Sequence, residues 1–293
     1  ELYGQTYHCW KKKGHGLMNL RNAIKQSCDT YFYEVARKLG IDRLNLTAEK
    51  FGLGKIVMNG VFQDEKKGLV PSTEWKKNTL GKGWVLGESL ITGIGQGYIQ
   101  TTPLQLCLMT AQLANGGFKI NPRITVDKNQ DTFEVIKAKM NQKIIEQNIN
   151  NKNKNSSQLN IIEKSEEFLK SFNKENMVLF RNQENIKFVQ NAMFGSTNEI
   201  GGTSYSSRID DKKYQFTGKT GTAQVKKITE RERELELKLE NIPYKERDHA
   251  LYIAYGPVIN PRYALSIIVE HGGSGSKIAA PIAKKLFKLI IDR

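Results

Sequence analysis

The chain has 293 residues, 39% of them hydrophobic, and a formal net charge of +15 at pH 7. That length suffices for one large hydrophobic core or two small ones, and no apolar run approaches the roughly 18 residues that a membrane-spanning helix needs. The basic charge suits nucleic acid, an anionic membrane surface or an acidic polymer, and also a merely Lys-rich composition. Because the lysines are scattered and no aromatic-basic motif occurs, we expect no nucleic-acid partner.

The N-terminal end resembles the middle of a domain, because Glu1 is not Met and no signal peptide follows. We therefore expect a fragment, whose missing targeting signal says nothing about its compartment. The odd number of cysteines, Cys9, Cys28 and Cys107, argues against a disulfide framework. Cys107 lies in an apolar helical stretch, where we expect it to act as a small buried hydrophobic residue.

The first part of the chain is predicted to be mainly helical. Apolar spacing predicts a helix over 19–40, and a second helix follows it. Residues 55–100 are rich in glycine and polar turns, so we expect a long irregular region there. A further helix is expected over 103–114, because Pro103 suits a first helical turn.

The stretch over 127–190 has a different composition, dominated by Lys, Asn, Gln and Glu. Such a composition favours a mobile surface insertion, with helical pieces around 131–147 and 175–193. Because the apolar elements on either side need each other to form a core, we do not place a domain boundary here.

The last third is predicted to contain strands followed by a helix. We expect a first strand within 213–225, a charged helical insertion over 228–247, and two partner strands over 250–255 and 263–270. A helix over 280–291 ends the chain. The pattern predicts an α+β fold, in which helices pack on an antiparallel sheet.

The most informative local motif is Lys219-Thr-Gly-Thr222, expected at a strand edge. Gly221 has no side chain, so a substrate can approach the backbone closely. Lys219 can bind a substrate carboxylate, Thr220 and Thr222 offer hydroxyl donors, and a backbone N–H can face an oxyanion. A three-residue motif of this kind also occurs by chance, so it needs support from elsewhere in the chain.

A second motif, Ser27-Cys-Asp29, lies within the first predicted helix. The Ser27 hydroxyl can relay protons, and Asp29 can anchor a substrate amide or a neighbouring loop. The alternative is that both are ordinary polar residues on a helix face. A Ser-x-Asn/Asp motif followed by Lys-Thr-Gly is two thirds of the pattern shared by penicillin-binding proteins and serine β-lactamases.

Four ordered motifs together resemble class B penicillin-binding proteins, most of all their elongation-type branch, penicillin-binding protein 2. They are Ser27-Cys-Asp-Thr-Tyr-Phe-Tyr33, Gly93-Ile-Gly-Gln-Gly97 with Thr102-Pro-Leu-Gln105, Lys219-Thr-Gly-Thr-Ala-Gln224, and Glu270-His-Gly-Gly-Ser274. Asp29 replaces the more common Asn. The resemblance covers nearly the whole chain except the insertion.

This resemblance implies the penicillin-binding protein/serine β-lactamase-like fold, an antiparallel sheet flanked by helices plus an all-helical subdomain. Residues 1–293 would form a partial transpeptidase domain. Its helical active-site part would cover about 1–125, its Lys/Asn-rich insertion about 127–190, and its C-terminal sheet and helix about 191–293.

The function that the resemblance implies is a peptidoglycan D,D-transpeptidase, which cross-links stem peptides ending in D-Ala-D-Ala and is acylated by β-lactams. Ser27, Asp29 and Lys219 would be catalytic, while Thr220, Gly221 and Thr222 would bind the substrate. The catalytic domain would lie in the periplasm of a protein anchored in the bacterial inner membrane. The implied partners are a membrane glycosyltransferase and other proteins of the elongation complex.

The nucleophile of this family is the Ser of a Ser-x-x-Lys motif that precedes Ser-x-Asn/Asp. The matches that begin at Ser171 and Ser274 both follow Ser27, so we interpret them as chance matches. We expect the true pair upstream of Glu1, and we expect the fragment alone not to acylate.

Two alternative functions remain open for the same fold, a β-lactam-sensing module and a serine β-lactamase. A β-lactamase needs a base that activates water, and no Glu motif for it is evident. The long path from Ser27 to Lys219 and the Gly93–Gly97 signature also favour the synthetic enzyme.

The resemblance implies no required cofactor, but a structural zinc ion is a candidate. Cys9, His15 and Cys28 have a C-x5-H-x12-C spacing, and thiolate and imidazole are zinc ligands. Some sequences of the penicillin-binding protein 2 branch hold zinc in this segment with Asp, Asp, His and Cys. Cys9 would replace the second Asp, and the fourth ligand would lie upstream. His8 as a ligand, an incidental cysteine pair and a disulfide remain alternatives.

Overall fold

The computed structural model describes residues 2, 4–58, 61–124, 178–226, 232, 235 and 239–292. Internal contacts divide the chain into one compact unit, Glu1–Ile120 with Leu179–Arg293, and a second, Asn121–Val178. The named helices and strands belong to the first unit. Most of the predicted insertion over 127–190 lies outside the described residues, as does the helical piece expected around 131–147. In the predicted helical insertion over 228–247, the described residues 239–247 contain two short 3-10 turns, Leu239–Asn241 and Tyr244–Glu246.

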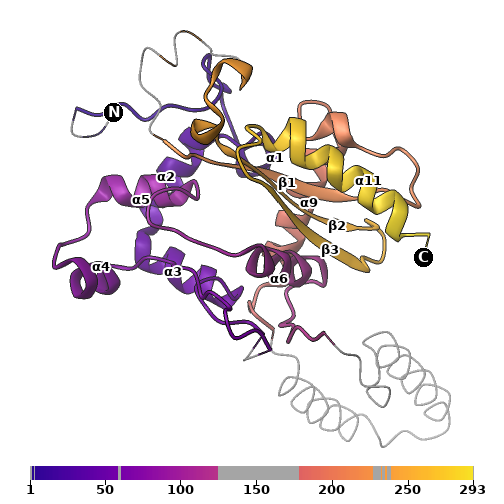
Figure 1. The fold of residues 1–293 in the computed structure, drawn as a ribbon, viewed down its shortest axis with the longest axis horizontal. Coiled ribbons are helices and arrows are strands. Elements are labelled where there is room, and N and C mark those ends of the chain that lie inside the picture. The colour runs from indigo at the N-terminus through magenta and orange to yellow at the C-terminus, as the bar shows by residue number, and fades with distance from the viewer. Residues whose placement is uncertain are drawn as a thin grey trace, which may run out of the picture. The chain divides into compact units, whose positions relative to one another are not determined.

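Helices and three strands make up the first unit (Figure 1). The helices are α1 (Leu20–Gln26), α2 (Asp29–Leu39), α3 (Ile41–Lys50), α4 (Thr73–Leu80), α5 (Leu86–Gly93), α6 (Pro103–Ala114), α9 (Gln183–Asn198) and α11 (Ala280–Ile290). Four short helical turns are η2 (Tyr205–Ser207), η3 (Leu239–Asn241), η4 (Tyr244–Glu246) and η5 (Gly275–Ala279), the last of which is a π-helix. Within the described part of the chain, no helix has both the length and the apolar character that crossing a membrane requires.

The prediction of one continuous helix over 19–40 is wrong, because the helix breaks after Gln26. Ser27 takes a left-handed backbone conformation with φ 53°, and Cys28 is extended, so α1 ends and α2 begins anew. Both helices keep apolar residues at helical spacing, and a break of two residues barely disturbs that periodicity. The pattern therefore could not reveal the turn.

Two short helices, α4 and α5, lie in the region 55–100 that was expected to be irregular, so that prediction is wrong in part. Each has only eight residues, too few for a clear apolar period. The Ser72 hydroxyl caps α4 by accepting from the Trp75 N–H at 3.0 Å. By contrast, α6 begins and ends where the sequence predicts.

The three strands form an antiparallel sheet in the order β1-β2-β3, with β1 (Thr217–Ala223), β2 (His249–Gly256) and β3 (Tyr263–Val269). This confirms the predicted partner strands and the antiparallel sheet. In the register of β1 with β2, Lys219 lies opposite Ile253 and Gly221 lies opposite Leu251. Since side chains alternate along a strand, Lys219 and Gly221 share one face of β1.

Helices cover both faces of the sheet. Figure 1 shows α11 lying across one face, where a core of buried residues forms between the helix and the strands. Its largest members are Phe216, Tyr252 and Phe287. On the opposite face, Tyr255 of β2 packs with Leu113 of α6 and with Ile186 and Met193 of α9. In addition, α9 contacts β1 and α1, which brings the end of α1 to the sheet.

Phe287→Ala is expected to destabilise the chain by about 3–5 kcal/mol, because it leaves a cavity in the core under α11. The Phe287 ring is fully buried and stacks on Phe216 with 4.8 Å between ring centroids. Chemical denaturation would measure the loss of free energy of unfolding. Leu289→Ala on the same helix is the matched control, because Leu289 is 64% exposed and should lose less than about 1 kcal/mol. Equal losses for the two variants would contradict this packing.

Candidate active site

Ser27 lies in the tight turn between α1 and α2, and its side chain is half-buried. The Cys28 N–H reaches back to the Ala23 carbonyl at 2.9 Å, a bond that closes the left-handed end of α1. This conformation usually belongs to glycine, and for a residue with a side chain it costs about 1–3 kcal/mol. Surrounding contacts must therefore hold the turn in place.

Lys219 on β1 reaches this turn across 192 positions of sequence. Its Nζ donates a hydrogen bond to Ser27 Oγ and a second one, of 2.9 Å, to the Thr220 carbonyl oxygen. The Ser27-Cys-Asp29 motif and the Lys219-Thr-Gly motif therefore meet in one site.

Burial shifts the pKa values of two charged residues near Ser27, Lys219 and Asp29. Burial lowers the pKa of Lys219 to about 8, although the Asp29 carboxylate acts in the opposite direction. Burial also raises the pKa of Asp29, against the bonds it accepts from the Trp10 N–H and the Cys9 thiol. A desolvated ammonium that titrates near neutral pH is able to bind an anion tightly or to exchange a proton.

The remaining residues of the β1 motif lie along the same strand. Thr220 Oγ1 is hydrogen-bonded to Thr203 Oγ1 at 2.9 Å, and Thr203 is in turn 3.1 Å from Ser196 Oγ. A methyl group added at Gly221 would lie 3.3 Å from Leu251 Cβ, a tight contact, so the missing side chain lets β1 pack closely on β2 beside Lys219. The Thr222 side chain is exposed. Sequence reasoning missed Thr203, which no motif singled out.

Gln96 is a second residue to which sequence reasoning gave no role, although it lies inside the Gly93–Gly97 motif. Its side-chain amide donates to the Thr222 carbonyl at 2.8 Å and accepts from the Gln224 N–H at 3.3 Å. Gly93, at the end of α5, packs directly on Ala36 of α2, so the loop is anchored near the Ser27 motif. Gln96 thereby holds the end of β1 from the side opposite β2.

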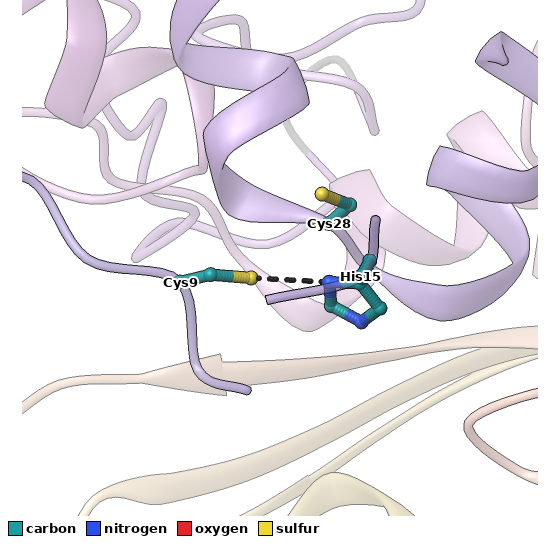
Figure 2. Close-up of side chains that lie close together, drawn as sticks. All are labelled: Cys9, His15 and Cys28. Carbon is teal, nitrogen blue, oxygen red and sulfur yellow. Dashed lines mark hydrogen bonds between the residues drawn. The ribbon is translucent and has the colours of Figure 1, made fainter. Parts of the chain in front are cut away.

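Cys9, His15 and Cys28 form a cluster beside Ser27, the thiol-imidazole cluster (Figure 2). Their ligand atoms all lie within 4.8 Å of one another, and His15 Nδ1 is 3.4 Å from Cys9 Sγ. All three cysteines of the chain are free thiols. Burial raises the pKa of Cys9, and burial together with the Lys11 charge lowers the pKa of His15. The imidazole is thus kept neutral, the form that coordinates metals.

This donor set fits a zinc ion. Zinc takes thiolates at about 2.3 Å and imidazoles at about 2.0–2.1 Å in a tetrahedron, which places neighbouring ligand atoms roughly 3.3–3.8 Å apart. His15 Nε2 is buried and has no hydrogen-bond partner among the described residues. The protein therefore does not satisfy this ring nitrogen. His8, the alternative ligand, is outside this group of three.

The described Ser-x-x-Lys match, Ser274 to Lys277, lies at the start of η5 just before α11. Ser274 caps this turn, since its hydroxyl accepts from the Lys277 N–H at 3.4 Å. Cys107, on α6, has its thiol 3.4 Å from the Ala264 carbonyl, away from the other two cysteines. The match at Ser171 lies outside the described residues.

Comparison with known proteins supports the family resemblance of the motifs. A family model described as "Penicillin binding protein transpeptidase domain" matches residues 1–288. A "Peptidoglycan D,D-transpeptidase MrdA" of Acinetobacter baumannii is 34% identical over 278 residues, which cover 93% of this chain and 35% of that protein. Its counterpart in Salmonella typhimurium is 31% identical over 98% of this chain and 40% of that protein.

Solved structures agree in fold. Penicillin-binding protein 2 of Pseudomonas aeruginosa, in complex with WCK 5153, matches with a TM-score of 0.70 and 33% identity over 98% of this chain and 52% of that one. Penicillin-binding protein 2 of Helicobacter pylori, in a complex with MreC, matches with a TM-score of 0.72 and 27% identity over 99% and 44%. The chain spans about 40% of the length of its curated relatives. It belongs to the penicillin-binding protein transpeptidase family and is of the penicillin-binding protein 2 (MrdA) type.

Proposed function

We propose that this chain forms most of the acyl-transfer site of a peptidoglycan D,D-transpeptidase. The supporting observation is the hydrogen bond from Lys219 Nζ to Ser27 Oγ, which joins the two motifs in one half-buried site. The relatives named peptidoglycan D,D-transpeptidase support the choice of reaction. The proposed nucleophile is the Ser of a Ser-x-x-Lys pair upstream of residue 1.

The reaction begins when that upstream Ser attacks the carbonyl between two D-alanines, and the Lys beside it accepts the hydroxyl proton. The C–N bond to the terminal D-Ala breaks, and Ser27 passes a proton to the leaving amine. An amine of a neighbouring stem peptide then attacks the acyl carbon, the ester C–O bond breaks, and the proton lost by the amine passes to the released Ser. A β-lactam mimics the D-Ala-D-Ala end and remains attached as a stable acyl-enzyme.

The β1 motif binds the carboxylate end of the donor peptide. Lys219 contributes the charge, and Thr220 and Thr222 contribute hydroxyl donors. The Thr222 N–H is one of two donors to the oxyanion, the other being the N–H of the nucleophile. Gln96 supports this arrangement because its bonds to the Thr222 carbonyl and the Gln224 N–H restrain the end of β1. Asp29 fixes the segment before α1 through the Trp10 N–H at 2.8 Å.

The whole protein would work at the bacterial inner membrane with its catalytic domain in the periplasm. A relative's structure with MreC and another titled as a peptidoglycan synthase complex support elongation-complex proteins and a glycosyltransferase as its partners. The proposed domain division is a helical active-site part over about 1–125, an insertion over about 127–190, and a C-terminal sheet and helix over about 191–293.

Ser27→Ala and Lys219→Ala are each expected to slow acylation by a fluorescent penicillin at least about tenfold in the full-length protein. Ser27→Ala removes a proton relay, and Lys219→Ala removes a charge-assisted hydrogen bond to the carboxylate. Labelling over time on denaturing gels would give the rate. Lys212→Ala is the matched control, because it removes the same charge from an exposed lysine before β1.

Absence of labelling of the folded wild type would contradict the acyl-transfer proposal. Release of the label within minutes would indicate the β-lactamase alternative. Stable labelling without release of D-Ala from a stem-peptide substrate would indicate the sensor alternative.

The rate of acylation by a carboxylate-bearing β-lactam is expected to fall as the pH rises through about 8. Lys219 has a lowered pKa of about 8, so it is protonated below that pH and loses its charge above it. The second-order rate constant of acylation should therefore show a falling limb there. Lys219→Arg keeps its charge at all these pH values and should lose that limb. An unchanged limb in Lys219→Arg would assign the titration to another group.

We also propose a structural zinc ion held by Cys9, His15 and Cys28, with a fourth ligand from upstream. When bound, the ion would cross-link the segment before α1 to the start of α2. Both thiols must lose their protons to bind the ion. Burial raises the pKa of Cys9 and so favours the protonated thiol, which zinc binding has to overcome.

Metal analysis of the full-length protein is expected to give one zinc ion per chain. Cys28→Ala should lower that content strongly, whereas Cys107→Ala, at a thiol outside the cluster, should leave it unchanged. A wild-type content well below one, or a disulfide between Cys9 and Cys28 seen by mass spectrometry, would contradict the site.

A further inference from the structure

Trp10 has an exposed side chain, yet both its indole N–H and its backbone N–H donate hydrogen bonds. Its side chain is 59% exposed, yet the indole Nε1–H donates to the Ser27 carbonyl at 2.8 Å and to the Gln26 carbonyl at 3.2 Å. Its backbone N–H donates to Asp29 Oδ2 at 2.8 Å. Trp10 therefore spans the turn between α1 and α2, bonding residues on both sides of it.

These bonds fall where the turn needs support. The last carbonyls of a helix have no partner within the helix, and Gln26 and Ser27 are the final residues of α1 and its cap. Ser27 has the left-handed conformation, with φ 53°, that its side chain disfavours. The indole N–H bonds both carbonyls as this conformation presents them, so it contributes to holding the turn in that conformation.

Trp10 also adjoins the thiol-imidazole cluster. It follows Cys9 directly, and its ring packs edge-on against His15 with 5.5 Å between centroids. Cys28 follows Ser27 on the other side of the turn. The indole is thus supported by the cluster while its N–H acts on Ser27.

We propose that Trp10 is a positioning residue for acyl transfer, which holds the Ser27 turn so that Ser27 Oγ stays bonded to Lys219 Nζ. This inference rests on the proposed function, because it assigns Trp10 an effect only through Ser27. Trp10 itself contacts no reacting atom in this account. Its effect is to keep the hydroxyl in the one orientation from which it passes a proton.

Trp10→Phe tests this directly, because it keeps an aromatic ring and removes the N–H. In the full-length protein, the rate constant of the acylation step should fall about fivefold to twentyfold, the effect of one or two lost hydrogen bonds. The β-lactam concentration at half-maximal rate should change less than twofold. Trp84→Phe is the matched control, because it removes a similar indole bond, of 2.8 Å to Ser89 Oγ, and should acylate normally.

A double-mutant cycle with Ser27→Ala separates positioning from a general loss of structure. If Trp10 acts through Ser27, Trp10→Phe should have no further effect on acylation in the Ser27→Ala background. The inference would be overturned if Trp10→Phe still caused its full loss of acylation rate in the Ser27→Ala background. A wild-type acylation rate in Trp10→Phe alone would also overturn it.

Proton exchange of the indoles tests the contact without any substitution. In NMR spectra of the full-length protein, the Trp10 indole proton should exchange more slowly than a free indole, despite the exposed ring. Exchange at the free rate would overturn the inference. If wild-type protein were not acylated at all, the proposed function would fail on its own, and the exchange rate would still decide whether Trp10 bonds the turn.

Discussion

The hydrogen bond between Lys219 Nζ and Ser27 Oγ is the contact around which the site is arranged. It forms only because α1 ends against the sheet, and α9 makes this possible by contacting both α1 and β1. Lys219 on β1 then reaches that helix end, and strand alternation places Gly221 on the same face of the strand. The burial of Lys219 at this contact also lowers its pKa.

The left-handed turn at Ser27 is a costly feature that several neighbours stabilise. Trp10 bonds the last carbonyls of α1, and its backbone N–H binds Asp29 at the start of α2. Cys28 anchors the turn in a small buried cluster with Cys9 and Ala23. A structural metal ion at the thiols would act on the same few residues. Its effect on the reaction would therefore be exerted through the geometry of Ser27.

Polar contacts also hold the strand side of the site. Gln96 bonds the edge of β1 that β2 leaves unpaired, and Thr203 bonds Thr220 from the loop after α9. Both contacts use backbone or hydroxyl groups near the proposed substrate carboxylate. They come from segments more than 100 positions apart in the chain, so the rigidity of β1 depends on the whole unit being folded.

Local patterns in the sequence were sufficient to predict the α+β class, the ends of α6 and the partner strands, through proline at a first turn and alternation along strands. A site shared by Ser27 and Lys219 was implied instead by the family resemblance of the ordered motifs. Tertiary structure alone decided the break at Ser27, the short helices α4 and α5, and the roles of Trp10, Gln96 and Thr203. The two short helices have too few residues for a clear apolar period, and the break depends on one backbone angle. The three side-chain roles depend on bonds between residues distant in sequence.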